Sequence, residues 1–370
     1  MAYRFKHGES FGDGLLRIGA EQLRRTSTAL EAAPGPAEVH DTRKTIKRLR
    51  ALLRLVRPGI GEADFKQLNA RLRDASRLLS AARDRTVLGH TIERLALDAD
   101  PADQSALASL LELVADDTTM PAAMDAESLA ESRRLLAKAA QAWDKLRLDP
   151  ESFAPLGAGL GTVLQDCKDA FAAAYASAAG AGDRDQLFHD WRKGVQRHWR
   201  HMQLFELAWP EYTTARVAQA KELSEILGQA QDLAVFVAFA EGLKQRSNKT
   251  VPAKTVPTKT RPSKTGPGPT RKQCQHLIQL ARKQQQALIE AAQPRGERLL
   301  AEGTSGHVKR IELFWSTAPA IEPLPSEPMT KPPDAPVVAV GMPAAALSAR
   351  TSRKRSTKST PRKSLARKPA

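Results

Sequence analysis

Two segments of the sequence place a histidine ahead of closely spaced arginines and lysines, side chains suited to binding phosphate groups. His40–Val56 reads HDTRKTIKRLRALLRLV and His189–Phe205 reads HDWRKGVQRHWRHMQLF, and six positions are identical when the two are aligned without gaps. Arginine offers forked donors to phosphate oxygens, and lysine offers a point charge. Histidine donates hydrogen bonds and gains charge as the pH falls. The pair of segments therefore indicates a site for an anion that carries several charges.

Each segment has the periodicity of an amphipathic helix. At about 100° per residue, one face of each helix collects the cationic side chains and the opposite face collects apolar ones. The cationic faces hold His40, Arg43, Lys44, Lys47 and Arg54 in the first segment, and His189, Arg192, Lys193 and Arg200 in the second. Gln196 and Gln203 stand where the first segment has Lys47 and Arg54. This difference predicts weaker binding by the second copy, unless Arg200 compensates for the two lost cations.

The similarity continues into the helices that follow. Residues 72–88 align with residues 220–236, and the identical pairs are Ser76/Ser224, Leu79/Leu227, Ala82/Ala230, Asp84/Asp232 and Val87/Val235. The chain is therefore predicted to consist of two related helical halves. Ordinary solvated surface helices are the alternative interpretation, but such helices have no reason to keep the same order of His, Asp, Arg and Lys twice.

Four aspartates recur in this alignment. Asp41 and Asp190 lie near the expected helix starts, where a carboxylate complements the helix dipole, and we interpret them as structural. Asp84 and Asp232 are candidates for orienting a basic side chain through a charge-assisted hydrogen bond, although an ordinary surface carboxylate fits them equally well.

The composition favours helix throughout the middle of the chain. Aromatic residues make up only 5% of the sequence, and Ala, Leu, Arg, Lys, Glu and Gln dominate long stretches. We predict an all-α fold without a substantial sheet. The expected helices cover about 10–31, 38–57, 62–97, 103–114, 126–147, 152–179, 186–209, 212–245 and 271–306. Pro58 and Gly59 are expected to end the second of these.

The net charge of +16 comes from two low-complexity segments. Residues 247–273 hold seven basic residues and residues 335–370 hold nine, and neither segment contains an acidic one. Closely spaced prolines without apolar periodicity predict that 247–273 is a disordered insertion, and the tail has the same character. The predicted organisation is a helical domain over 1–316, with halves of about 1–150 and 151–316, followed by a disordered basic tail over 317–370.

Several other classes of protein are not expected. Cys167 and Cys274 lie far apart, without the spacing of a disulfide framework or a zinc site, and we expect neither a metal nor a cofactor. Residues 1–10 lack the apolar core of a signal peptide, and no run approaches the roughly 20 apolar residues of a membrane span, so we expect a cytoplasmic protein. His7, His90, His276 and His307 have no counterpart in the repeat and are assigned no role. His198 and His201 are interpreted as packing or rim residues.

The repeated His-x-x-Arg-Lys helix resembles the CHAD family, the conserved-histidine α-helical domain. The opening Tyr3-Arg-Phe-Lys and Glu9 also resemble the start of its members, and the resemblance extends from about residue 3 to about residue 315. It implies two pseudo-symmetric four-helix bundles with a basic groove between them that binds inorganic polyphosphate. Some members are associated with polyhydroxyalkanoate granules.

Carried over to this sequence, the resemblance implies two sets of polyphosphate contacts. They are His40, Arg43, Lys44, Lys47, Arg50 and Arg54 from the first copy, and His189, Arg192, Lys193, Arg197 and Arg200 from the second. An enzyme is not expected, because no Glu-x-Glu-x-Lys triphosphatase motif is present and cations rather than carboxylates surround both histidines in the sequence. Binding of nucleic acid through the basic tail is the alternative function.

Overall fold

In the computed structural model, every regular element of the described residues is helical, which confirms the predicted all-α class. The described residues are 3–31, 34–97, 99–116, 125–149, 152–176, 181–246 and 268–320. The helices are α1 (Phe11–Glu31), α2 (Pro36–Ile60), α3 (Glu62–Leu78), α4 (Ala81–Leu97), α5 (Pro101–Asp116), α6 (Ala126–Trp143), α7 (Ala154–Tyr175), α8 (Ala181–Leu204), η1 (Glu206–Ala208), α9 (Pro210–Arg246), α10 (Arg271–Leu300), α11 (Thr304–Thr317) and η2 (Ala318–Ala320). Most of the predicted insertion, and the predicted tail beyond residue 320, lie outside these residues.

Some predicted boundaries are wrong. The expected helix over 62–97 is interrupted after Leu78 and resumes at Ala81 as α4, whereas its counterpart in the second half, α9, is continuous. Pro58 does not stop α2, which continues to Ile60, because a proline in the last turn costs only one backbone hydrogen bond. Gly61 ends α2 instead, with a φ of 85° that favours glycine.

The region after the insertion begins where the expected helix over 271–306 begins and is helical for longer than that helix. Helix α10 begins at Arg271 and is preceded by a capping box. The Thr270 hydroxyl oxygen accepts a hydrogen bond from the backbone N–H of Gln273, and the Gln273 side-chain oxygen accepts one from the backbone N–H of Thr270. Residues 271–273, which the two predictions assigned both to the insertion and to the helix, are helical. The helical region extends through α11 and η2 to Ala320, four residues beyond the predicted domain boundary.

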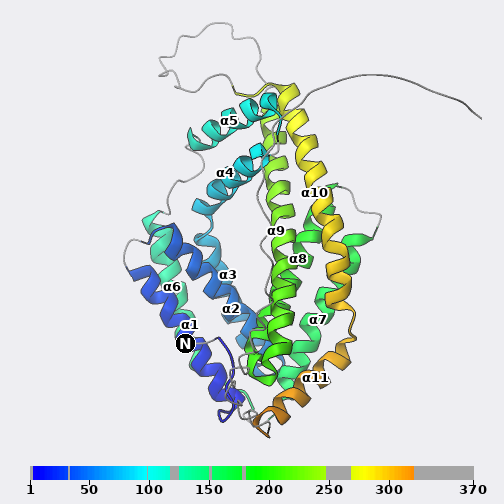
Figure 1. The fold of residues 1–370 in the computed structure, drawn as a ribbon. Coiled ribbons are helices and arrows are strands. Elements are labelled where there is room, and N and C mark those ends of the chain that lie inside the picture. Colours follow the sequence, from blue (N-terminus) through cyan, green and yellow to red (C-terminus); the bar gives the residue numbers. More distant parts are fainter. Residues whose placement is uncertain are drawn as a thin grey trace, which may run out of the picture. The chain divides into compact units, whose positions relative to one another are not determined.

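Helices α1, α2, α3 and α6 pack around one core, and α7, α8, α9 and α10 pack around another (Figure 1). Trp143 of α6 is fully buried in the first core, where its indole N–H donates to the Leu15 carbonyl at 3.1 Å. Trp191 of α8 is fully buried in the second core. Each core fills with the apolar faces that the helical periodicity predicts.

Helices α4 and α5 form a third cluster with one end of α9 and α10. Leu107 and Leu110 of α5 are fully buried there together with Phe236 of α9 and Leu277 of α10. Figure 1 shows α4 and α5 beside the far ends of α9 and α10, away from α1 and α6. Part of the first half of the sequence therefore packs on helices of the second half.

Helix α2 joins the first core to the second by packing against both α7 and α8. Gly159 of α7 allows the closest approach, because a Cβ atom at this position would lie 1.9 Å from the Leu55 carbonyl oxygen. Nearby, the His201 Nε2 atom of α8 lies 3.0 Å from the Ala51 carbonyl oxygen of α2. The two helices that carry the repeated histidines are thereby held side by side.

Helix α9 is long and apolar enough to cross a membrane, with a mean hydropathy of 1.2 in its most apolar window. It packs along α8 and α10, and 44% of that window is buried within the protein. Core helices of globular proteins have the same length and composition, so this helix is weak evidence for a membrane span.

Candidate anion-binding site

The contact between α2 and α8 brings together three half-buried arginines. Burial, followed by repulsion from Arg197 and Arg50, lowers the pKa of Arg54 to about 9. Burial and the charge of Arg197 likewise lower the pKa of Arg50, and burial lowers that of Arg197 itself. These shifts show that cations from both halves lie close enough to repel one another. We call Arg50, Arg54 and Arg197 the arginine cluster.

Little negative charge compensates the arginine cluster. Arg50 Nε donates to Asn69 Oδ1 at 3.0 Å, and Arg54 Nη1 donates to the Arg50 carbonyl at 3.2 Å, so both of these partners are neutral. Asp166 of α7 is exposed and raises the pKa values of Arg54 and Arg197 without forming an ion pair with either, and Asp74 and Asp190 act in the same way on Arg50 and Arg197. Among the described residues, no member of the cluster forms an ion pair with a carboxylate. An anion in this place would therefore meet guanidinium groups without strong internal competitors.

The two basic rows also influence each other at His189 of α8, which feels the charge of Lys47 of α2. Burial, followed by the charges of Lys193 and Arg192, lowers the pKa of His189 to about 4, and Lys47 contributes to the same shift. The Nδ1 atom of His189 is buried and has no hydrogen-bond partner within the described part of the chain. His189 is therefore uncharged at neutral pH. His40, its counterpart in the repeat, is exposed near the start of α2, so the two histidines differ in environment.

The repeated arginines, Arg43 and Arg192, make equivalent contacts in the two halves. Arg43 Nη1 donates to the Ser76 carbonyl at 2.8 Å and also to the Ser80 hydroxyl, and Arg192 Nε donates to the Ser224 carbonyl at 3.1 Å. Ser76 and Ser224 are themselves an identical pair of the internal repeat. These arginines connect α2 to α3 and α8 to α9, so they have a structural role in addition to their charge.

The repeated lysines pair with the repeated aspartates one turn earlier. Lys44 Nζ lies 3.6 Å from Asp41, and Lys193 Nζ lies 2.7 Å from Asp190. All four side chains are well exposed, and surface ion pairs of this kind contribute about 0–1 kcal/mol. A phosphate group can therefore compete with the aspartates for both lysines.

Arg200 lies in the interior rather than on the face that it shares with His189 on the helical wheel. Its side chain is 7% exposed, its guanidinium lies 5.0 Å from the Trp199 ring centre, and Nη1 donates to the Gln196 carbonyl at 2.5 Å. Burial lowers its pKa to about 10, although proximity to Tyr3 opposes this shift. This position gives no support to the idea that Arg200 replaces the cations lost at Gln196 and Gln203.

The structure says little about Asp84 and Asp232, the two aspartates predicted to orient basic side chains of the site. The side chain of Asp84 lies outside the described residues, and Asp232 is half-buried in α9. Two residues that the sequence did not single out contribute instead, namely Asn69 as a partner of Arg50 and Asp166 as a carboxylate that raises the pKa values of Arg54 and Arg197. Neither lies in the repeated segments, so the repeat held no signal for them.

The part of the chain that carries both basic helices matches a known protein family. The model of the CHAD domain matches residues 16–241, which include both basic helices. The chain is a member of the CHAD family. No curated protein matches the chain by sequence.

Two solved structures share the fold of this CHAD protein. The CHAD domain from the plant Ricinus communis is 19% identical, with a TM-score of 0.55, and the match covers 81% of this chain and 95% of that one. PptA from Streptomyces chartreusis is 16% identical, with a TM-score of 0.52, and the match covers 80% of this chain and 100% of that one. At these identities the likeness concerns the fold alone.

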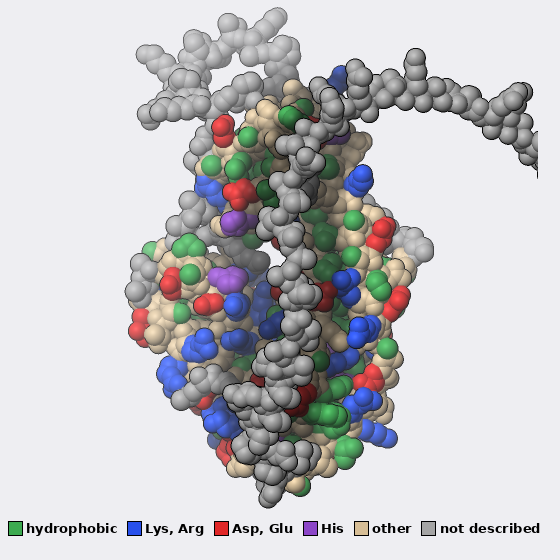
Figure 2. Space-filling view, viewed as in Figure 1, with side chains coloured by type: hydrophobic (Ala, Val, Ile, Leu, Met, Phe, Trp, Pro, Cys, Tyr) green, Lys and Arg blue, Asp and Glu red, His purple; other side chains and the backbone are tan. Residues whose placement is uncertain are grey.

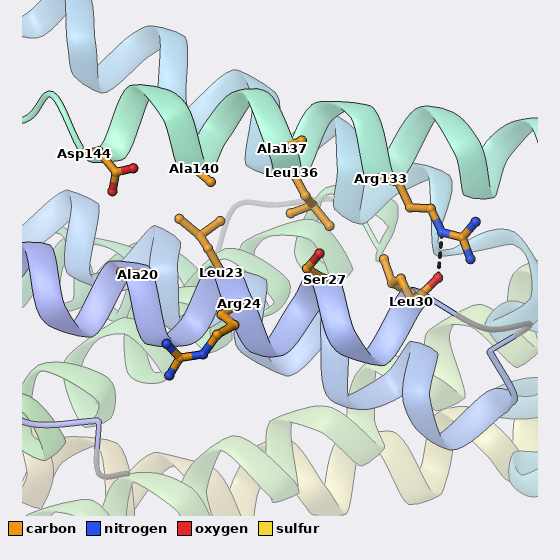
Figure 3. A pocket seen from close by; sticks show the side chains of 10 residues that line it. All are labelled: Ala20, Leu23, Arg24, Ser27, Leu30, Arg133, Leu136, Ala137, Ala140 and Asp144. Atoms are coloured by element: carbon orange, nitrogen blue, oxygen red, sulfur yellow. Dashed lines mark hydrogen bonds between the residues drawn. The ribbon is translucent and has the colours of Figure 1, made fainter.

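Basic side chains gather on one face of the CHAD domain. Figure 2 shows a hollow in one face of the molecule, with Lys and Arg side chains in and around it. A separate pocket of about 430 Å³ lies between α1 and α6, lined mainly by apolar and small side chains such as Leu23, Leu136 and Ala140 (Figure 3). Arg133 at its rim donates to the Leu30 carbonyl at 2.6 Å. This pocket contains none of the predicted contact residues and lacks the converging cations that phosphate requires.

Proposed function

We propose that this CHAD protein binds inorganic polyphosphate between α2 and α8 and catalyses no reaction. The observation that carries the proposal is the arginine cluster, in which half-buried cations of both halves repel one another without a paired carboxylate among the described residues. Such an arrangement is unfavourable in the free protein and becomes favourable when an anion bridges the guanidinium groups.

A linear anion fits this arrangement better than a compact one. The cations of α2 extend from Arg43 to Arg54, which corresponds to about 16 Å at about 1.5 Å per residue. The exposed Lys44 and Lys193 lie beyond the half-buried arginines on their respective helices. Polyphosphate carries about one charge per phosphate along a flexible chain, so one molecule is able to contact both the lysines and the arginine cluster.

The same residues favour binding over catalysis. A histidine that accepts a phosphoryl group or binds a metal ion needs a neighbouring carboxylate or an open metal site, and cations surround His189 instead. Asp190, the carboxylate next to it, is paired with Lys193. The hydrogen bonds of His189 are therefore best suited to holding a phosphate group.

The proposal is tested by removing one arginine of the cluster from each half. The variant Arg50→Gln with Arg197→Gln is compared with a matched control, Arg57→Gln with Arg134→Gln, which removes two exposed arginines that pair with Glu62 and Glu131. Both variants lose two positive charges. Affinity for long-chain polyphosphate is measured by calorimetry at physiological salt, after circular dichroism has shown that both variants remain helical.

Loss of two charge-assisted contacts, each of about 1.5–3 kcal/mol, should weaken binding by the cluster variant by at least about 100-fold. The control should lose less than about threefold, because its arginines serve only the overall charge. Equal losses in the two variants would show that polyphosphate responds to overall charge, and the proposed site would then be wrong.

A further inference from the structure

Far from the arginine cluster, two helices bring together three side chains that commonly bind metal ions. Asp100 and Asp103 lie at the start of α5, and His276 lies in the second turn of α10. One ligand atom from each of the three lies within 4.8 Å of the other two. His276 Nε2 is 3.1 Å from Asp103 Oδ2. The residues that meet here are separated by more than 170 positions in the sequence, so this is a tertiary arrangement and not a local run of acidic residues.

The two carboxylates are held in place by the start of α5. Asp100 Oδ1 accepts hydrogen bonds from the backbone N–H groups of Ala102 at 3.0 Å and Asp103 at 2.9 Å. These bonds orient the carboxylate and leave its second oxygen for another partner. The Asp103 side chain is only 10% exposed, so it offers a largely desolvated oxygen beside the imidazole. Both ligands are thus preorganised.

The charge balance of this cluster is incomplete. Although the chain carries a net charge of +16, neither Asp100 nor Asp103 forms an ion pair with a lysine or arginine within the described ranges. Lys244, next to His276 in space through its contact with Gln275 at 2.9 Å, is already paired with Glu241 at 2.6 Å. The imidazole of His276 carries a charge only when it is protonated. A buried carboxylate usually has a compensating cation, and in the part of the chain that the structure describes no side chain pairs with these carboxylates as a permanent cation.

We propose that Asp100, Asp103 and His276 bind a divalent transition-metal ion of the zinc class, which links α5 to α10. Carboxylate oxygens and an imidazole nitrogen are ligands that Zn²⁺ accepts, and three protein ligands leave at least one position for water. Asp100 and His276 are exposed, so the ion can enter directly from solvent. The ion would coordinate the lone pair of His276 Nε2, so Nε2 must carry no proton when the ion is bound. The proton of the neutral imidazole then lies on Nδ1.

A metal ion at this place would have a structural consequence. The cluster of α4 and α5 is held to α9 and α10 by apolar contacts among residues such as Leu107 and Leu277. The proposed ion would add a link between α5 and the beginning of α10, the helix that follows the insertion in the sequence. Metal binding should therefore raise the thermal stability of the protein.

The test uses the full chain after treatment with a chelator and in the absence of polyphosphate, which itself binds divalent ions. Zn²⁺ is titrated into the parent protein, His276→Gln and Asp103→Asn, and Co²⁺ provides a second readout through its visible absorption spectrum. His90→Gln is the matched control, because His90 forms an exposed pair with Glu93 at 3.2 Å without a third ligand.

We expect one Zn²⁺ ion per chain in the parent and in His90→Gln, and at least about tenfold weaker binding in both His276→Gln and Asp103→Asn. His276 is exposed, so its replacement should leave the helix content unchanged and isolates the loss of a ligand. Absence of Zn²⁺ binding by the parent, or equal affinity in His276→Gln and His90→Gln, would overturn the proposal. Neither outcome depends on whether the arginine cluster binds polyphosphate.

Discussion

Replacing Arg54 with methionine should stabilise the free protein while weakening its binding to polyphosphate. Methionine has a similar length but no charge, so the change removes one member of the arginine cluster with little loss of packing. Within the described residues, Arg54 has no carboxylate partner, and its side chain donates one hydrogen bond, to the Arg50 carbonyl at 3.2 Å. The residue is therefore costly in the absence of ligand.

The size of the effect follows from the lowered pKa of Arg54. Burial, followed by repulsion from Arg197 and Arg50, lowers its pKa to about 9, well below the ordinary value of an arginine. Because a lowered pKa of a base means that folding disfavours the charged form, this shift corresponds to at most about 5 kcal/mol at neutral pH. Arg54 is only half-buried, so solvent screening reduces the penalty to about 2 kcal/mol. Loss of the neutral hydrogen bond offsets about 1 kcal/mol of the gain.

The assay compares thermal unfolding of the parent, Arg54→Met and Arg57→Met with and without long-chain polyphosphate. Arg57 lies one turn further along α2, is exposed and pairs with Glu62 at 2.8 Å. Without ligand, the melting temperature should rise by about 2–4 °C in Arg54→Met and should stay level or fall in Arg57→Met. Polyphosphate should stabilise the parent more than it stabilises Arg54→Met. The reasoning is refuted if Arg54→Met is less stable than the parent without ligand, or if polyphosphate stabilises both equally.

Three further predictions concern stability, pH and the length of the ligand. Arg43→Ala or Arg192→Ala should lower the free energy of unfolding by about 1–3 kcal/mol, because each arginine connects two helices through a hydrogen bond. Lys44→Ala, which removes only an exposed ion pair, should lower it by less than about 1 kcal/mol. Equal effects of these substitutions on urea unfolding would contradict this expectation. Burial lowers the pKa values of His201 and His307 to about 4. As the pH drops below about 6.5, these histidines take up protons in the unfolded chain but not in the folded protein, so the stability of the folded protein should fall. The loss between about pH 6.5 and 4 should reach up to about 3 kcal/mol for each histidine. Melting temperatures that stay constant over this pH range would argue against it. Long polyphosphate should bind much more tightly than tripolyphosphate, with a steep dependence on salt, and similar affinities would indicate a compact pocket instead.

The sequence by itself determined the helical class, the duplicated order of the halves and the two basic rows. Helical periodicity is a local property, so the spacing of Leu49 and Leu53 against Arg43 and Lys47 is sufficient to predict which face of α2 is buried. The repeat also predicted which residues have equivalent neighbours. The matching contacts of Arg43 and Arg192 with the carbonyls of aligned serines confirm that equivalence in the structure.

Only the tertiary structure decided what each cation contacts. Arg197 and Arg48 are identical positions of the repeat, yet Arg197 lies in the arginine cluster whereas Arg48 lies 5.8 Å from the ring centre of Tyr3. Arg200 is buried although the helical wheel places it with exposed residues. Burial and repulsion depend on side chains that approach from distant parts of the chain, and a periodic pattern within one helix contains no information about them. The same reason explains why the meeting of Asp103 with His276 has no signal in the sequence.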